Sequence, residues 1–416
     1  SANSSDGTGA TARTYDPRGL SYSAPSGAYA QGRLFVADTY NNTIRQVDVA
    51  TAAVSTLAGS ASNGGSANGT GAAARFIAPE GISTSAPSGV YTQGRLFVAS
   101  TGNHTIRQVD LATGAVSTLA GAAGSSGSAN GTGVAARFSS PRGISASAPN
   151  AIYPQGRLFV ADSSNHMIRQ INVATGAVSI LAGLAGSGGG SGSADGTGVA
   201  ARFYNPYGIS YSEPSAAYAQ GRLFVADTSN HTIRQIDVAT GVVSTLAGLA
   251  GSYGPANGTG AAARFNTPRG ISYSEPSGAY TQGRLFVADT YNNTIRQIDV
   301  ATGVVSTLAG QAGSAGSTDG TGTAARFNTP RDISYSAPSG VYTQGRLFVA
   351  DRDNHSIRQI DIATGAVTTV LGQAGQSGFR PGAAPGVLNT PVGVAVSGNA
   401  LYITMQNGVV QAVPLP

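Results

Sequence analysis

The segment GRLFVAD constrains the fold of this chain more than any other feature of the sequence. It occurs six times, and the second copy ends in Ser100 instead of Asp. Successive copies begin 62 or 65 residues apart, at Gly32, Gly94, Gly156, Gly221, Gly283 and Gly345. A period of this length indicates an array of one supersecondary unit. Because each unit of an array packs mainly on its neighbours, a chain of 416 residues needs no single large core.

Each unit contains four predicted strands, as the second unit illustrates. Residues 81–85 are small and suit a strand in a crowded place, whereas residues 95–99 are apolar on both faces, which is typical of a doubly buried strand. Residues 105–111 alternate between polar and apolar, and residues 115–120 form the fourth strand after a turn with Gly. Four antiparallel strands of increasing polarity, repeated radially, predict an all-β protein made of β-propeller blades. A solenoid is the main alternative, but its repeats are usually shorter.

The repeated motifs DGTGxAARFNTPRGISYS, GRLFVADTYNNTIRQID and TGVVSTLAG resemble NHL repeats over essentially the whole chain. That family takes its name from an Asn-His-Leu before the third strand. Here the first two residues match in four copies and read Asn-Asn in two, while the Leu is never present. The matching asparagines are Asn103, Asn165, Asn230 and Asn354, with Asn41 and Asn292 in the Asn-Asn copies. The resemblance implies a propeller that serves as a binding platform for protein, RNA or glycan and is rarely an enzyme.

The sequence predicts one domain over residues 1–416 with seven blades. Six are four-stranded, and the last has three strands because no fourth strand follows it in the sequence. The predicted blades span about 19–58, 81–120, 143–182, 208–247, 270–309, 332–371 and 393–413. Six blades with an appended hairpin are the alternative. An uncovered outer edge on a seventh blade would be a site for pairing with another chain.

One face of the predicted propeller carries many N-x-S/T sequons, which are glycosylation acceptors in secreted eukaryotic proteins. Five precede the third strand: Asn41, Asn103, Asn230, Asn292 and Asn354. The others are Asn3 and the interblade-loop residues Asn68, Asn130 and Asn257. In the loops Asn exchanges with Asp, which favours a turn-capping role. Turn geometry also explains the Asn before the third strand, but it does not explain why Thr or Ser follows in five of six units.

The opposite face carries one Tyr in each SAPSGxYxQ insert. These residues are Tyr29, Tyr91, Tyr153, Tyr218, Tyr280 and Tyr342. A circle of aromatic rings is a candidate surface for stacking on sugars or anchoring a protein partner. The alternative is that each Tyr packs down on its own loop.

Composition argues against nucleic-acid and membrane partners. The net charge is +5, but every basic residue is Arg, and nearly all lie at four fixed places in the repeat, close to repeated carboxylates. Such scattered and partly paired Arg is typical of structural roles and not of a phosphate-binding stripe. No apolar run approaches the roughly 20 residues of a membrane span. Cys is absent and therefore does not identify a redox compartment.

No catalytic, cofactor-binding or metal-binding residue is predicted. The four histidines, His104, His166, His231 and His355, recur at one turn position in different blades, whereas zinc needs three or four converging ligands. The DGTG loops offer one carboxylate each, too few for a strong calcium site. The chain lacks GxSxG, Walker and HExxH motifs.

The functional expectation is a non-enzymatic, extracellular or cell-surface structural or adhesive propeller. It would carry glycans on its sequons, and it would associate with itself or with other proteins. The alternative is a recognition module that binds carbohydrate or peptide through the Tyr-bearing inserts or over the propeller axis. A propeller hydrolase or lyase is the third hypothesis, which requires a metal or carboxylate cluster near the axis.

Overall fold

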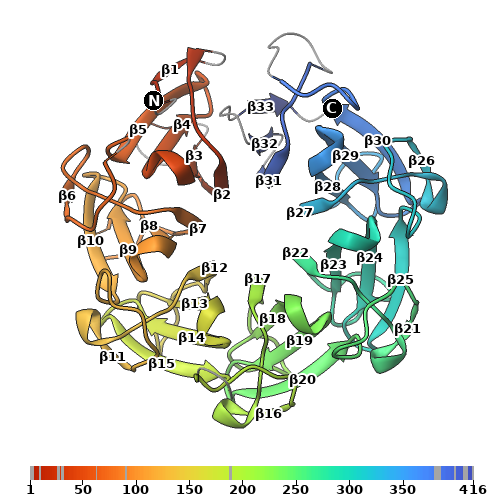
Figure 1. Cartoon of the computed structure of the whole chain (residues 1–416), viewed down its shortest axis with the longest axis horizontal. Helices are drawn as coiled ribbons and strands as arrows, with labels where there is room; N and C mark the ends of the chain where they lie inside the picture. Colours follow the sequence, from red (N-terminus) through yellow and green to blue (C-terminus); the bar gives the residue numbers. More distant parts are fainter. Residues whose placement is uncertain are drawn as a thin grey trace. The chain divides into compact units, whose positions relative to one another are not determined.

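The structure, a computed structural model, describes residues 4–8, 11–25, 29, 32–61, 63–89, 91–186, 190–378, 386–397, 400–405 and 411–414. The chain forms strands joined by loops and single 3-10 turns (Figure 1). It divides into two compact units. Unit 1 comprises Ser1–Ser191, Gly198–Arg202 and Gln406–Pro414, and unit 2 comprises Gly192–Thr197, Phe203–Met405 and Leu415–Pro416. Among the described residues, no helix is long and apolar enough to cross a membrane.

Unit 1 contains three five-stranded antiparallel sheets, blades 1 to 3. Blade 1 has the order β1-β5-β4-β3-β2, and blades 2 and 3 repeat it. The strands of blade 1 are β1 (Gly7–Thr8), β2 (Pro17–Ser23), β3 (Arg33–Asp38), β4 (Thr43–Asp48) and β5 (Ala53–Gly59). Those of blade 2 are β6 (Gly69–Thr70), β7 (Pro79–Ser85), β8 (Arg95–Ser100), β9 (Thr105–Asp110) and β10 (Ala115–Ala120). Those of blade 3 are β11 (Gly131–Thr132), β12 (Pro141–Ala146), β13 (Arg157–Asp162), β14 (Met167–Asn172) and β15 (Ala177–Ala182).

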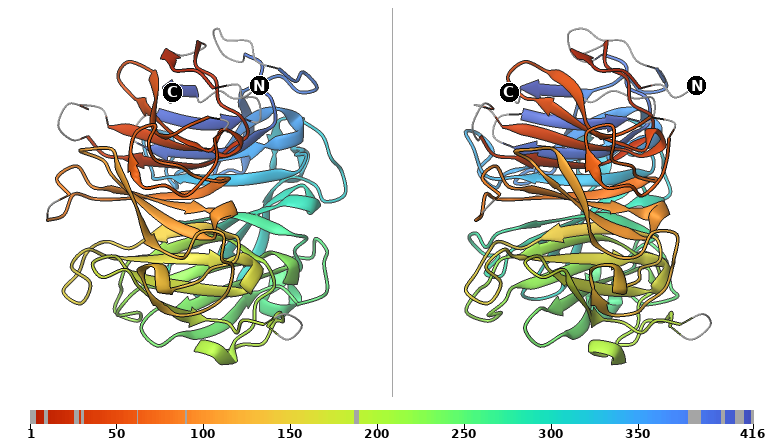
Figure 2. Two further views of the ribbon diagram at one scale, coloured as in Figure 1. Left: turned by 60° about the vertical axis from the view of Figure 1, so that its left-hand side comes forward. Right: turned by 90° about the vertical axis from the view of Figure 1, so that its left-hand side faces the viewer.

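Unit 2 contains blades 4 to 6 with the same strand order, followed by a hairpin. Blade 4 has β16 (Gly196–Thr197), β17 (Pro206–Ser212), β18 (Arg222–Asp227), β19 (Thr232–Asp237) and β20 (Val242–Ala247). Blade 5 has β21 (Gly258–Thr259), β22 (Pro268–Ser274), β23 (Arg284–Asp289), β24 (Thr294–Asp299) and β25 (Val304–Ala309). Blade 6 has β26 (Gly320–Thr321), β27 (Pro330–Ser336), β28 (Arg346–Asp351), β29 (Ser356–Asp361) and β30 (Ala366–Leu371). Figure 2 shows the blades from two further sides.

Short 3-10 turns occupy two recurrent places. One, which we call the Asn turn, joins the second and third long strands of each blade: η2 (Thr39–Asn41), η3 (Thr101–Asn103), η5 (Ser163–Asn165), η7 (Thr228–Asn230), η9 (Thr290–Asn292) and η11 (Arg352–Asn354). The other lies in the loop that enters a blade: η4 (Gly133–Ala135), η6 (Gly198–Ala200), η8 (Gly260–Ala262) and η10 (Gly322–Ala324).

The predicted count of four strands per blade is wrong by one. The Gly-Thr of each DGTG or NGTG loop forms a two-residue strand that pairs with the outermost long strand, as where Gly69 faces Val116 and Thr70 faces Ala115. The loop that enters a blade therefore covers part of that blade's outer edge. A two-residue strand is too short to produce an alternation of polar and apolar residues, so the sequence pattern does not reveal it.

The second long strand of each blade carries the core, as its apolar sequence predicts. In blade 1, Leu34, Phe35, Val36 and Ala37 have no exposed surface, and the equivalent residues of the other blades are equally buried. Phe35 and Ala37 belong to one hydrophobic cluster with residues of blade 2, including Leu96. The core of each unit thus lies between adjacent sheets, which is how a repeat array buries apolar surface without a central core.

Adjacent blades of a unit also meet along their first long strands. The Oγ of Ser21 accepts a hydrogen bond from the N–H of Thr84 in blade 2, at 3.0 Å. A Cβ at Gly19 would collide with the carbonyl oxygen of Glu80, and a Cβ at Gly81 would collide with that of Arg142. Glycine is required here because the backbones of neighbouring blades approach each other more closely than a side chain allows.

The predicted seventh blade is wrong, and the alternative of six blades and a hairpin is correct. After blade 6, β31 (Pro391–Ser397) pairs with β32 (Ala400–Met405), and Val394 faces Ile403. A four-residue strand, β33 (Gln411–Pro414), follows. Unlike blades 1 to 6, this segment has no DGTG loop to provide an outer strand and no TGxVSTLAG strand. The outer edge that was expected for a seventh blade includes residues 406–410, which lie outside the described residues.

Candidate functional site

The Asn turn holds most of the polar residues that the repeat preserves. Its 3-10 turn ends in a residue with left-handed backbone, such as Asn42 at φ 57° and His104 at φ 59°. Asn and His are among the few residues other than Gly that adopt this conformation without large strain. The turn also contacts the loop that enters its own blade, because the N–H of Gly102 donates to the carbonyl of Ile77 at 3.0 Å.

The side chain of this left-handed residue links its blade to the next one. Nδ1 of His104 accepts a hydrogen bond from the N–H of Ser140 at 3.1 Å, and Oδ1 of Asn42 accepts one from Ala78 at 2.9 Å. The same bond joins His231 to Thr267, Asn293 to Thr329 and His355 to Thr390, at 2.8–3.0 Å. These three histidines therefore act as backbone acceptors between blades. Within the described part of the chain, no group of three or more His, Cys, Asp or Glu is placed to hold a metal ion.

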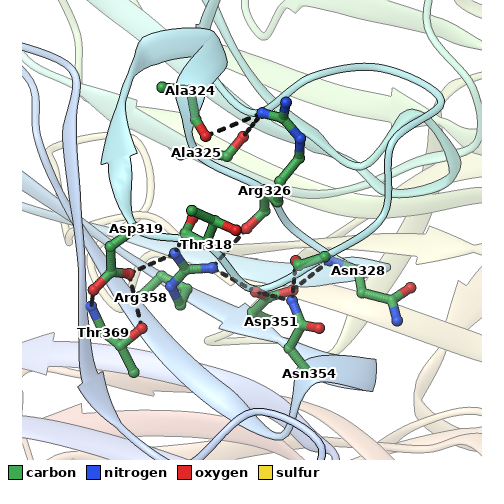
Figure 3. Close-up of polar contacts among 11 residues, drawn as sticks. Thr318, Asp319, Ala324, Ala325, Arg326, Asn328, Asp351, Asn354, Arg358 and Thr369 are labelled. Atoms are coloured by element: carbon green, nitrogen blue, oxygen red, sulfur yellow. Dashed lines mark hydrogen bonds and ion pairs between the residues drawn. The ribbon is translucent and has the colours of Figure 1, made fainter.

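The asparagine that precedes this residue is buried in every blade where it forms a sequon. Its exposed fraction is 0–6% for Asn41, Asn103, Asn230, Asn292 and Asn354. In Asn354, Nδ2 donates to Oδ2 of Asp351 at 2.7 Å (Figure 3). It also donates to the carbonyl of Gly316 at 2.5 Å. The amide nitrogen that would carry a glycan thus already has two acceptors in the interior. A glycan on Nδ2 of Asn354 would replace one of the two amide hydrogens and thereby break one of these buried hydrogen bonds.

A fully buried Arg on the third long strand connects the Asn turn to the interblade loop. In blade 6, the guanidinium of Arg358 binds Asp351 at 3.0 Å, Asp319 at 2.7 Å and the carbonyls of Arg326 and Thr318 at 2.7 and 3.0 Å (Figure 3). It also lies 5.0 Å from the ring centroid of Phe327. Charge-assisted hydrogen bonds to a fixed guanidinium fork are strong and directional, so this Arg fixes the loop to the blade.

The number of carboxylates around this Arg differs between blades. Among the residues that the structure describes, Arg358 has two, whereas Arg107 in blade 2 has none, because Ser100 replaces the buried Asp and Asn68 replaces the loop Asp. Burial raises the pKa of Asp351 to about 6, and hydrogen bonds from Asn328, Asn354 and Arg358 oppose the rise. Burial lowers the pKa of Arg107 to about 10.

The loop sequons lie in a different environment from the Asn-turn sequons. Asn68, Asn130 and Asn257 are exposed. Their Oδ1 atoms accept hydrogen bonds from the buried Arg107, Arg169 and Arg296 at 2.7–2.8 Å. An Asp carboxylate takes the same role in the other blades, which explains the exchange of Asn and Asp at this position. Asn3 lies outside the described residues.

The insert tyrosines pack against their own blades. Each ring lies over the guanidinium of the GRLF arginine, with Cζ 4.1–4.3 Å from the ring centroid. The same guanidinium lies 5.2–5.6 Å from the Phe that is two residues further along the strand. All six tyrosines, Tyr29, Tyr91, Tyr153, Tyr218, Tyr280 and Tyr342, are half-buried. The structure therefore gives each Tyr a packing role and leaves part of its ring at the surface.

The clearest departure from the repeat lies in unit 1, at the start of the first long strands. Four blades have Arg at the second position of this strand, but blade 2 has Glu80. Its Oε1 accepts a hydrogen bond from Arg18 of blade 1 at 2.8 Å, and its Oε2 lies 3.9 Å from Arg142 of blade 3. Arg18 also binds Asp16 at 3.2 Å. These four charged residues join three consecutive blades.

Sequence reasoning missed both the blade-linking residue and this charged group. For the first, the signal was that only Asn and His occupy the position, since the two share tolerance of left-handed backbone and an acceptor atom. For the second, the signal was the departure from the repeat at Asp16 and Glu80. Single departures from the repeat are visible in the sequence. Only the structure shows that Asp16 and Glu80 both bind the guanidinium of Arg18.

Blades of this type define a repeat-built β-propeller, and comparisons with known proteins agree. No family model matches the chain. Solved structures with this fold include virginiamycin B lyase from Staphylococcus aureus (TM-score 0.56, 10% identity, 99% of each chain covered). An auxiliary nutrient binding protein from Bacteroides thetaiotaomicron is also similar (TM-score 0.51, 14% identity, 92% of this chain and 87% of that one). At such identities the likeness concerns the fold alone.

The relatives in sequence identify the repeats. NHL repeat-containing protein 2 from Homo sapiens is 28% identical over 311 residues, which cover 69% of this chain and 40% of that protein. The protein SUPPRESSOR OF QUENCHING 1, chloroplastic, from Arabidopsis thaliana is 29% identical over 307 residues, which cover 72% of this chain and 26% of that protein. The repeats of this β-propeller are thus similar to NHL repeats, as its motifs indicated, and the chain spans less than half the length of these relatives.

Proposed function

We propose that this chain is a non-enzymatic structural or adhesive propeller that acts outside the cell or at its surface. The observation that supports this most directly is how the repeat uses its polar residues. Four polar residues of the repeat bind within a blade or between adjacent blades. They are the recurrent Asn of the Asn turn, the Asn or His that follows it, the buried Asp and the buried Arg. Hydrogen bonds and ion pairs of this kind stabilise an array of near-identical units. The exposed loops of these units are then the surfaces that contact partners.

Glycosylation is part of this proposal, but only at the loop sequons. Asn68, Asn130 and Asn257 are exposed residues, whereas the Asn-turn residues that form sequons are buried. In addition to glycans, we propose self-association or protein partners, because loops of such regular composition present the same contact several times.

The test is to isolate the protein from its native source and measure its intact mass, its glycopeptides and its assembly state. The proposal predicts hexose additions on peptides with Asn68, Asn130 or Asn257, none on peptides with Asn103 or Asn230, and particles larger than one chain. A monomer without sugar would contradict it.

An enzymatic role, as in the structurally similar virginiamycin B lyase, is the competing hypothesis. We expect no conversion of quinupristin, the compound bound in a solved complex of that lyase. Chromatography of quinupristin after incubation with the purified chain tests this, with the lyase as a positive control. Conversion above the protein-free rate would overturn the non-enzymatic assignment.

A second candidate function is recognition through the insert tyrosines. The supporting observation is that each ring is fixed on one side by an Arg while it stays half-buried, which presents a rigid aromatic surface. Carbohydrate or peptide binding at this surface should weaken when Tyr91 is changed to Leu, which keeps apolar volume but removes the ring. Unchanged binding in Tyr91→Leu, Tyr218→Leu and Tyr280→Leu would exclude the insert surface.

A further inference from the structure

The group of charged residues in unit 1 adjoins an exposed pair of tyrosines, and no other blade has Tyr at both of the equivalent positions. Tyr15 lies in the loop that enters blade 1, and Tyr40 lies in the Asn turn of the same blade. Their ring centroids are 5.1 Å apart at an interplanar angle of 72°. The N–H of Tyr40 donates to the carbonyl of Tyr15 at 3.1 Å, so the two backbones are held together. Tyr15 is 44% exposed and Tyr40 is 50% exposed.

The pair depends on two departures from the repeat in one blade. Blade 5 also has Tyr in its Asn turn, Tyr291, but Asn266 occupies the position equivalent to Tyr15. Blade 4 has Tyr204 at the position of Tyr15, but Ser229 at the position of Tyr40. In a chain of copied blades, departures that converge in space indicate a place with a role of its own.

The aromatic pair and the charged group are contiguous. The guanidinium of Arg18 lies 5.9 Å from the ring centroid of Tyr40, and two carboxylates, from Asp16 and Glu80, hold it in place. Arg142 is the more accessible cation, with 39% of its side chain exposed. Rings and planar polar groups thus lie side by side on one surface that belongs entirely to unit 1.

Glu80 supplies an independent sign that this surface is incomplete. Its side chain is 91% buried, given its exposed fraction of 9%. Among the described residues, none donates a hydrogen bond to its Oε2 atom, and the nearest recorded cation is Nε of Arg142 at 3.9 Å. A buried carboxylate oxygen without a donor is costly, so a donor from outside the chain would stabilise it. A ligand hydroxyl that displaces the exposed end of Arg142 would provide this donor.

We propose that this surface, formed by Tyr15, Asp16, Arg18, Tyr40, Glu80 and Arg142, binds a neutral carbohydrate. The apolar C–H face of a sugar ring packs on the exposed tyrosine rings, and its hydroxyl groups bind the guanidinium donors and the Glu80 carboxylate. Two carboxylates and two guanidiniums balance in charge, which disfavours a strongly anionic ligand such as a nucleic acid or a sulfated sugar. The proposal does not depend on the structural role above, because that role rests on the Asn-turn asparagines, the left-handed residues after them, and the buried Asp and Arg of each repeat, none of which belongs to this surface.

The experiment titrates the purified chain with neutral oligosaccharides of glucose, xylose, mannose and N-acetylglucosamine, using calorimetry and saturation-transfer NMR. We expect binding of at least one of them, and about tenfold weaker binding in Tyr40→Ala, because the stacking surface is lost. Glu80→Arg, which introduces the residue found in four of the other blades, should weaken binding to a similar extent.

Tyr291→Ala is the matched control, because it removes an equally exposed tyrosine from the same turn of blade 5. It should leave the affinity unchanged, and thermal unfolding of all three variants identifies any that are misfolded. Loss of binding in Tyr291→Ala equal to that in Tyr40→Ala would overturn the site. Absence of binding to every neutral oligosaccharide, or binding to sulfated and uronic oligosaccharides alone, would overturn the ligand class. Neither result would affect the assembly and glycosylation expected of the structural role.

Discussion

Histidine and asparagine exchange at the end of the Asn turn because the position makes two demands. The backbone must be left-handed, and the side chain must offer an acceptor to the N–H of the next blade. Asn meets both demands at any pH, through its Oδ1. His meets the second only while it is neutral, since a protonated imidazole has no acceptor. Blades joined by His are therefore sensitive to acid at a point where blades joined by Asn are not.

Changing His231 to Asn should remove part of the acid sensitivity of unit 2. Burial lowers the pKa of His231, so the folded state disfavours its charged form. The stabilising contribution is complete above the ordinary pKa of about 6.5 and is lost as the pH falls below it. One hydrogen bond is worth about 1 kcal/mol, or about 2 °C in Tm for a chain of this size. Calorimetry at pH 7.5 and pH 5 measures how far Tm falls with acid. This fall in Tm should be about 2 °C smaller in His231→Asn than in the wild type.

The buried aspartates change the stability with pH in the opposite sense. They are the same in the wild type and in His231→Asn, so their effect cancels when the two are compared. Their pKa values are raised, which means that protonation at low pH stabilises the folded state. The control variant is Asn293→His, which should gain the acid sensitivity that His231→Asn loses. Equal pH dependence in the wild type and both variants would show that these acceptors do not govern it.

Introducing Asp at position 100 should stabilise blade 2. Ser100 Oγ accepts hydrogen bonds from the N–H of Ile77 and from Asn103, but it leaves Arg107 without a carboxylate. In blade 5, Asp289 binds the equivalent Asn and also Arg296 at 3.0 Å. An unbalanced buried charge is costly, so Ser100→Asp should add about 1–2 kcal/mol to the free energy of unfolding, measured by urea denaturation at pH 7.

The neutral variant Ser100→Asn separates charge from shape. It is close in size to Asp but cannot neutralise Arg107, so we expect it to be no more stable than the wild type. Asp289→Ser should have the reverse effect and destabilise blade 5. If Ser100→Asp proves less stable than Ser100→Asn, the buried guanidinium of blade 2 is satisfied by its carbonyl and amide acceptors alone.

At the level of secondary-structure elements, the long strands were predictable and the short ones were not. The second long strand is apolar on both faces over residues 95–99, and this pattern identifies a buried strand directly. The two-residue strand at Gly69 has no such pattern and depends on pairing with a distant segment. The sequence predicts a three-stranded seventh blade over residues 393–413 because its first two strands match the repeat. The sequence already shows that this segment lacks the TGxVSTLAG strand, and the structure distinguishes the two alternatives, a three-stranded seventh blade and six blades with a hairpin.

Asp332 adapts blade 6 to that hairpin. In blades 1 to 5 the equivalent residue is Gly. In blades 1, 2, 4 and 5 this Gly allows the next first strand to approach. In blade 6 the neighbour is β31, and Oδ2 of Asp332 accepts a hydrogen bond from the N–H of Val394 at 3.0 Å. Burial raises the pKa of Asp332 to about 6. The carboxylate therefore takes part in fixing the hairpin to unit 2, together with Ser334, which accepts from Val396.

Replacing Asp332 with Gly should loosen the hairpin without unfolding the six blades. The N–H of Val394 loses its acceptor, at a cost of about 1 kcal/mol, so hydrogen exchange in residues 391–397 should accelerate about fivefold. Asp332→Asn is the control, because its amide oxygen still accepts the same hydrogen bond, and its exchange should stay near that of the wild type. Equal acceleration in both variants would indicate that charge, and not the hydrogen bond, fixes the hairpin.

For the molecule as a whole, the copied sequence conceals where blades differ in function. The sequons illustrate this: Asn68 and Asn103 carry the same motif, yet the first is exposed and the second is buried with both amide hydrogens donated. The N-x-S/T motif alone therefore does not distinguish an exposed asparagine from a buried one. The charge balance is concealed in the same way, because 12 of the 24 basic residues are buried arginines that contribute little to the surface.

Because repeat arrays are stabilised blade by blade, the carboxylate count predicts which blade opens more easily. Within unit 1, Arg107 of blade 2 has no carboxylate, whereas Arg169 of blade 3 binds Asp162 at 3.2 Å. We therefore expect faster hydrogen exchange in β9 than in β14, although both strands are central in their sheets and share the segment Ile-Arg-Gln. Ser100→Asp should slow exchange in β9 and leave β14 unchanged. If β9 and β14 exchange at the same rate in the wild type, the buried charge pairs do not set local stability, and the nearly identical apolar cores of the two blades must do so.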